Sequence, residues 1–68
     1  MRLNLIDADK RTRDEETRIR FMLEDMLTAI PAGTANSPAA LIPLLIGRFS
    51  VPDVMANLDQ VMHMRTAR

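Results

Sequence analysis

The pattern of apolar and polar positions divides this chain into three apolar segments. In the first segment apolar residues recur every three or four positions, at Ile19, Met22, Leu23, Met26, Leu27 and Ile30. This spacing is typical of one face of a helix. Thr12 followed by Glu15 fits a capping box and predicts the helix start. Pro31 and Gly33 predict its end, so we expect a first helix over 12–30.

The second segment, residues 38–46, contains no polar side chain. Ser37 before Pro38 is a favourable helix start, because a hydroxyl stands at the cap and a proline in the first turn. Pro43 removes the backbone hydrogen bond to Ala39, so we expect this helix to be kinked or split into two turns. A helix that is apolar all round has no face for water, so we also expect it to be covered on all sides.

The third segment has the most regular helical spacing in the chain: Val51, Val54, Met55, Leu58, Val61 and Met62. Ser50 and Asp53 form a second capping pattern, and we expect a helix over 51–64. At the other end of the chain, residues 2–5 alternate polar and apolar. We therefore expect a short extended arm over 1–11, either flexible or paired with the arm of a second chain.

Together these elements predict one all-α domain over residues 1–68, a small three-helix domain in which 12–30 and 51–64 enclose 38–46. A core of this size rarely supplies more than about 3–5 kcal/mol, so such chains usually add a disulfide, a metal or a second subunit. There is no cysteine. We therefore expect a homodimer. The expected dimer or protein-binding seam consists of Ile19, Met22, Leu23, Met26, Ile30, Leu41, Leu44, Leu45, Met55, Leu58 and Met62.

Charge argues against a protein that holds nucleic acid by bulk attraction, because nine basic and nine acidic residues give a formal net charge of zero. Thirteen of the eighteen charged residues lie in residues 1–25. On the helix expected over 12–30, both sides of the apolar stripe carry charges of both signs. One side has Arg11, Asp14, Arg18 and Asp25, and the other has Arg13, Glu16, Arg20 and Glu24. Mixed charges beside an apolar stripe are typical of helix pairing, so we expect a protein partner.

Candidate catalytic and metal-binding residues are few. The single histidine, His63, has Asp59 four residues earlier, which is typical of an exposed helix pair. Ser37 and Ser50 are explained by capping. A zinc or calcium site needs about four or more ligands, and this pair offers two. We therefore expect no enzyme, no cofactor, no metal and no small-molecule substrate.

The favoured interpretation is a small non-enzymatic regulatory or adaptor protein that binds another protein through an apolar, Met-rich helical surface. The first alternative is a sequence-specific DNA-binding regulator, a helix-turn-helix or ribbon-helix-helix-like dimer. It would use Arg2, Asn4, Arg11, Arg13, Arg18 and Arg20. The second alternative is a structural subunit of a larger assembly. Without cysteine, and without the roughly 20 apolar residues that span a bilayer, we expect a cytoplasmic protein with no membrane partner.

Overall fold

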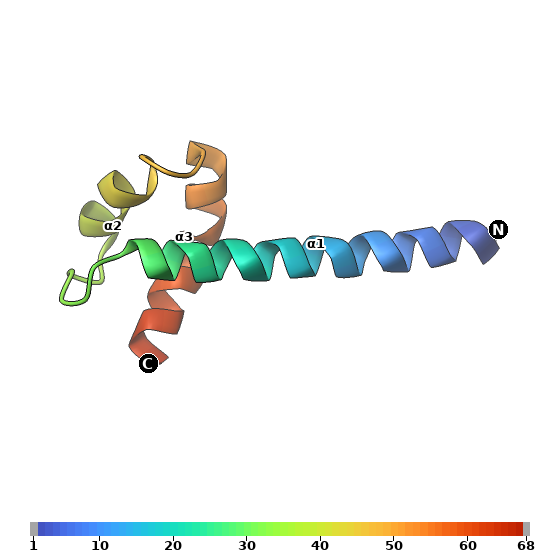
Figure 1. Cartoon of the computed structure of the whole chain (residues 1–68), viewed down its shortest axis with the longest axis horizontal. Coiled ribbons are helices and arrows are strands. Elements are labelled where there is room, and N and C mark those ends of the chain that lie inside the picture. The colour runs from blue at the N-terminus through green and yellow to red at the C-terminus, as the bar shows by residue number, and fades with distance from the viewer. Residues whose placement is uncertain (1, 68) are drawn as a thin grey trace.

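The computed structural model describes the backbone of residues 2–67 and the side chains of residues 12–67. Over that backbone the chain forms three helices and no strand (Figure 1). They are α1 (Arg2–Ala29), α2 (Pro38–Leu45) and α3 (Val51–Ala67). The predicted all-α class and the three-helix organisation are confirmed.

Both serine caps predicted from the sequence are present. The Ser37 hydroxyl accepts a hydrogen bond of 3.3 Å from the Ala40 N–H at the start of α2. The Ser50 hydroxyl accepts one of 3.2 Å from the Asp53 N–H at the start of α3. Each bond satisfies a backbone donor that the first turn of a helix leaves without a partner.

The helix α1 does not begin at Thr12, where we expected the cap, but continues back to Arg2. The physical reason is that no glycine or proline occurs before Pro31, so no residue interrupts the helical backbone at that point. The side chains of residues 1–11 lie outside the described part of the chain. Pairing of the expected arm with a second chain therefore stays a prediction.

The helix α2 is continuous through Pro43, and it ends at Leu45 rather than at the expected Ile46. Pro43 and Ala39 are both exposed. Water can therefore reach the Ala39 carbonyl that lost its helical donor, which limits the cost of an internal proline. Separation into two turns, one of the two outcomes we expected, does not occur.

One core holds the three helices together, and each helix contacts the other two. The buried core consists of Leu23, Met26, Leu27, Ile30, Leu41, Leu45, Val54, Leu58 and Val61. Because α1 and α3 cross and contact each other directly (Figure 1), α2 is not enclosed between them as we expected. An eight-residue helix is only about 12 Å long and cannot separate two longer ones.

The all-apolar segment is covered on one side only. Leu41 and Leu45 are fully buried, whereas Leu44 and Ile46 remain 39% and 46% exposed. The single chain therefore leaves Leu44 and Ile46 uncovered, and their burial by a second chain stays a prediction. Two neighbouring helices cover only the facing side of a third, so its other side stays in solvent.

The loop between α1 and α2 is fastened to the end of α3. The Asn36 amide donates to the Met62 carbonyl at 2.9 Å and to the Thr66 hydroxyl at 3.0 Å. The Arg65 guanidinium donates to the Asn36 side-chain oxygen at 3.2 Å and to the Thr34 carbonyl at 2.8 Å. These polar contacts connect residues about 30 positions apart and fix the lower end of α3.

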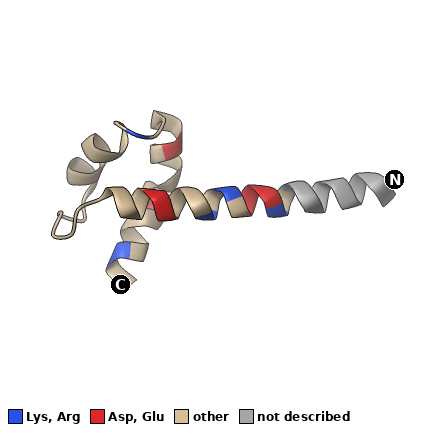
Figure 2. Cartoon of the chain, viewed as in Figure 1, with Lys and Arg blue, Asp and Glu red and all other residues tan. Residues whose placement is uncertain are grey.

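The described part of α1 extends beyond the core. Every side chain from Thr12 to Arg18 is exposed. The radius of gyration is 14.8 Å, against about 11 Å for a compact chain of this length. This portion of α1 is a charged helical surface that α2 and α3 leave uncovered (Figure 2).

Candidate protein-interaction surfaces

The structure places most of the expected seam residues inside the chain's own core. The buried members are Leu23, Met26, Ile30, Leu41, Leu45 and Leu58. The half-buried members are Ile19, Met22 and Met62, and the exposed members are Leu44 and Met55. In this fold a partner could reach only the last two groups, because intrachain contacts already cover the first.

Exposed apolar side chains gather where α2 is joined to α3. Leu44, Ile46, Val51 and Met55 are 39%, 46%, 57% and 57% exposed, and all four lie within residues 44–55. We call this set the corner surface; the junction stands above α1 in Figure 1. Val51 and Met55 are four residues apart, which places them on one face of α3.

Backbone hydrogen bonds fix this corner. The Ile46 N–H donates to the Ile42 carbonyl at 3.0 Å and closes α2. The Leu45 carbonyl then accepts from the Arg48 N–H at 3.0 Å and from the Phe49 N–H at 2.9 Å. Phe49 is half-buried and packs against the core. The corner surface is therefore presented by a short, anchored turn.

Sequence reasoning missed three of the exposed apolar residues: Ile46, Val51 and Phe21. Phe21 is 66% exposed on α1, and its position off the apolar stripe was visible in the sequence. Val51 lies on the predicted stripe of α3, so periodicity assigned it to the buried face. In the folded chain Val51 is nevertheless 57% exposed, which periodicity did not predict.

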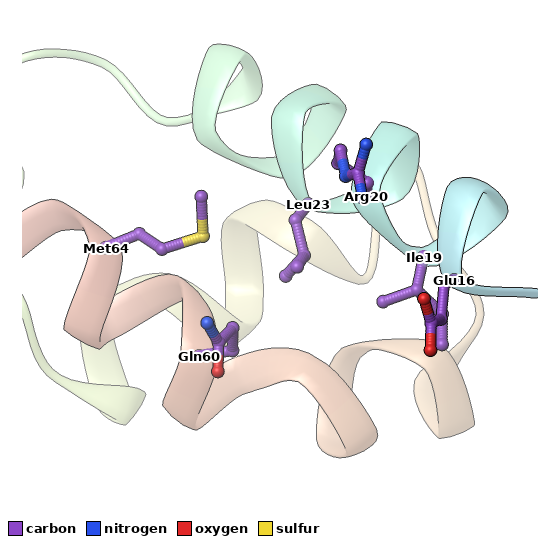
Figure 3. Close-up of a pocket in the computed structure, with 6 residues that line it drawn as sticks. All are labelled: Glu16, Ile19, Arg20, Leu23, Gln60 and Met64. Atoms are coloured by element: carbon purple, nitrogen blue, oxygen red, sulfur yellow. The ribbon is translucent and has the colours of Figure 1, made fainter. Parts of the chain in front are cut away.

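A second surface is the open groove where α3 crosses α1, with a volume of about 390 Å³. Its lining residues are Glu16, Ile19, Arg20, Leu23, Gln60 and Met64. In Figure 3, Ile19 and Leu23 extend from α1 toward α3, and Met64 extends from α3 toward α1. The groove thus has an apolar floor with Glu16 and Arg20 on the α1 side. We call it the α1–α3 groove.

Asn57 of α3 is half-buried, with its side chain near Met22 of α1. Its amide donates to the Asp53 carbonyl at 2.8 Å and lies 3.6 Å from the Met22 sulfur. These contacts hold the Asn57 side chain toward the chain's own helices. It is therefore not presented as a base-reading group of a recognition helix would be.

Basic and acidic residues are intermixed along the described part of α1 (Figure 2). Arg13, Arg18 and Arg20, candidates in the DNA-binding alternative, are exposed. The Arg18 guanidinium lies 2.6 Å from a Glu15 carboxylate oxygen. The hydrogen bond from Arg18, and then its positive charge, lower the pKa of Glu15 from its usual value. The side chains of Arg2, Asn4 and Arg11 lie outside the described residues.

Other candidate chemistry is sparse in the described residues. His63 and Asp59 are both exposed on α3. Among residues 12–67, His, Asp and Glu side chains form no group of three or more that could hold a metal ion. None of the described helices combines the length and the apolar character needed to cross a bilayer. The corner surface and the α1–α3 groove are thus the features that we consider for function.

Comparisons with protein-family models, with curated proteins and with solved structures find no match to this chain. Function is therefore inferred from the chemistry of these two surfaces.

Proposed function

We propose that this chain is a small non-enzymatic regulatory or adaptor protein that binds another protein through the corner surface. The supporting observation is that four exposed apolar side chains lie within residues 44–55, around the junction of α2 and α3. Scattered single apolar residues are ordinary on a protein surface, whereas a cluster is typical of an interaction site. Burying such side chains against a partner contributes roughly 25 cal/mol per Å² of apolar area.

The test compares a variant of the corner surface with a matched variant elsewhere. Val51→Glu with Met55→Glu adds charge at two exposed positions, and an acid at Val51 is compatible with a helix N-terminus. Phe21→Glu is the control, because Phe21 is at least as exposed but lies on α1. All three proteins are used as bait in extract of the source cells, with quantitative mass spectrometry and purified reconstitution of each captured protein.

We expect a partner that binds the unaltered chain and the Phe21→Glu variant but not the Val51→Glu, Met55→Glu variant. Binding that is equal for all three proteins would contradict the corner surface as the site. A partner that stays bound in a fixed ratio through purification would instead favour the structural-subunit alternative.

The DNA-binding alternative has less support among the described residues. Asn57 is engaged within the chain, and the exposed arginines of α1 are intermixed with acids. A gel shift on random duplex DNA at low salt separates the two functions, because even specific DNA-binding proteins show salt-sensitive non-specific binding there. We expect no shift, and a salt-sensitive shift would restore the DNA-binding alternative.

We also propose that this chain forms a homodimer. Among residues 12–67 the core has nine buried side chains, which is small for a stable monomer. The corner surface and the α1–α3 groove remain open in the single chain. A second copy at one of them would add buried apolar area without a disulfide or a metal.

A further inference from the structure

The side of α1 that borders the α1–α3 groove carries charges of alternating sign. Their order along the helix is Arg13, Glu16, Arg20 and Glu24, and all four side chains are exposed. At 3.6 residues per turn, these positions lie within about a quarter of the helix circumference. Two of them, Glu16 and Arg20, also line the groove itself.

From Arg13 to Glu24 the signs run positive, negative, positive, negative, and in the opposite direction they run negative, positive, negative, positive. A second copy of the helix that runs antiparallel can therefore place opposite charges against this row. When the helix is laid antiparallel to a copy of itself and centred near Arg18, each Glu16 faces the Arg20 of the other helix. The same alignment brings each Arg13 opposite a Glu24. A two-fold axis between identical helices creates such contacts in pairs, because each contact from one chain is repeated by the other.

We propose that the α1–α3 groove is occupied by α1 of a second copy of this chain, antiparallel to the first, with Glu16 of each chain paired with Arg20 of the other. This inference depends on the homodimer proposed above and names its surface. The corner surface then remains open for a different protein.

The apolar floor of the groove supplies the attraction that charges alone do not. Ile19 is half-buried in the single chain, and it lies one residue from the proposed two-fold axis. Leu23 and Met64 continue the apolar surface toward α3, as Figure 3 shows. The Ile19 of the second chain would meet this floor near its centre, with Glu16 and Arg20 forming a charged rim on the α1 side. An apolar centre with a polar rim is the usual composition of a protein interface.

The charges also favour a second copy over other occupants. Among the described residues, the ion pair on α1 joins Glu15 and Arg18, and Glu16 and Arg20 form no ion pair within the chain. Both are therefore available to a partner. Nucleic acid would be repelled by the acidic half of this row. Thr12 to Arg18, which form one half of the proposed contact, are exposed and are not covered by α2 or α3.

The experiment uses two charge reversals in the full chain, studied separately and then mixed. In the Glu16→Arg variant, the introduced arginine faces Arg20 of the other copy. In the Arg20→Glu variant, the introduced glutamate faces Glu16 of the other copy. Each homodimer then contains two like-charge contacts, so we expect its dissociation constant to rise by about tenfold or more, as measured by analytical ultracentrifugation.

Mixing the two variants distinguishes a contact between the two chains of a dimer from a contact within one chain. In a heterodimer of the two variants both cross-chain contacts join opposite charges again, so we expect equimolar mixing to restore the dimer. Within each variant chain, positions 16 and 20 carry the same sign before and after mixing. An effect within the chain would therefore not be reversed by mixing.

A matched control is Asp14→Arg, which makes the same change in charge at an exposed position on the other side of α1. We expect its dissociation constant to stay within about twofold of the unaltered protein. Circular dichroism of every variant checks that the helices are retained, as expected for substitutions of exposed side chains.

Three outcomes would overturn the inference. If the unaltered chain is a monomer at micromolar concentration, the homodimer itself is wrong. If the unaltered chain is a dimer and both reversals leave it unchanged, the homodimer stands but uses another surface. If the reversals weaken the dimer and mixing does not restore it, Glu16 and Arg20 act within one chain.

Discussion

At the residue scale, leucines of one short helix differ completely in their surroundings. Leu41 is fully buried in α2, whereas Leu44 is 39% exposed in the same helix. The sequence around both is equally apolar, so composition does not distinguish them. Their difference comes from the direction in which each side chain leaves the helix relative to α1 and α3.

We predict that Leu41→Ala and Leu44→Ala have very different effects on stability. Removing a buried leucine side chain costs about 2–5 kcal/mol, because apolar transfer energy is lost and a cavity remains. That cost is comparable with the roughly 3–5 kcal/mol expected for so small a core. Leu41→Ala should therefore leave the chain largely unfolded at 25 °C, whereas Leu44→Ala should lower the free energy of unfolding by less than about 1 kcal/mol.

Urea denaturation followed by far-ultraviolet circular dichroism measures both variants. Each substitution removes the same atoms from the same helix, so a difference in helix propensity does not explain a difference in stability. Equal destabilisation of the two variants would show that Leu44 is buried in solution, either in the fold or in an oligomer.

At the element scale, α2 is an apolar helix with a proline in its interior. Pro43 lies in the exposed part of the helix and removes one helical donor. Pro38 lies at the first helical position, where the N–H has no helical acceptor and a proline costs little. The two prolines therefore have opposite consequences for the same helix.

We predict that Pro43→Ala stabilises the protein by about 1–2 kcal/mol. Alanine restores the hydrogen bond to the Ala39 carbonyl and is favoured over proline by about 3 kcal/mol within a helix. Part of this gain is offset because the unfolded chain becomes more flexible. Thermal and urea unfolding measure the change, with Pro38→Ala as the control that should be neutral or slightly destabilising. A loss of stability in Pro43→Ala would mean that the backbone geometry imposed by Pro43 is needed for packing.

The contribution of the Glu15–Arg18 ion pair on α1 depends on pH. The hydrogen bond from Arg18 lowers the pKa of Glu15 in the folded chain. The pair is therefore fully favourable above the unfolded pKa of the carboxyl group, and its contribution is lost as the pH falls through the lowered folded pKa. Because both groups are fully exposed, the effect on stability is small.

We predict that Glu15→Gln slightly lowers the helix content and melting temperature at neutral pH. The difference from the unaltered protein should shrink as the pH falls through the lowered pKa of Glu15 and vanish once Glu15 is protonated. Circular dichroism melts over a pH series measure this difference. A difference that stays constant down to low pH would show that the Glu15 side chain acts by helix propensity rather than by charge.

At the scale of the whole molecule, three helices share one small core while part of α1 stands outside it (Figure 1). The exposed apolar corner and the charged α1 row lie on different elements. One chain could therefore pair with its own copy and bind a second protein without competition between the two surfaces.

We predict that the melting temperature rises with chain concentration. Association stabilises only the folded state, and a hundredfold rise in concentration contributes about 2.7 kcal/mol for each dimer. For a dimer of this size, that corresponds to a rise of about 5–10 °C. Differential scanning calorimetry over a hundredfold concentration range measures it. A melting temperature that does not change with concentration would mean that a single chain unfolds.

The fold class could be predicted because each apolar segment carries its own local signals. Ser37 and Ser50 cap their helices through bonds to residues only three positions away, so their roles are visible in the sequence. The start of α1 was misplaced because a capping pattern at Thr12 also fits the interior of a longer helix. Local sequence patterns show where a helix can begin or end, but they do not show that it must do so there.

What the sequence alone determined about this protein is the helical character of its segments and the apolar stripe of each helix, because both depend on neighbours three or four residues away. Only the tertiary structure decided which apolar residues stay in solvent. Leu44, Ile46, Val51 and Met55 are exposed because α1, α2 and α3 meet in pairs around one core and leave the outer side of the α2–α3 corner uncovered. That outcome depends on contacts between residues that are distant in the chain, and the periodicity of the sequence does not predict such contacts.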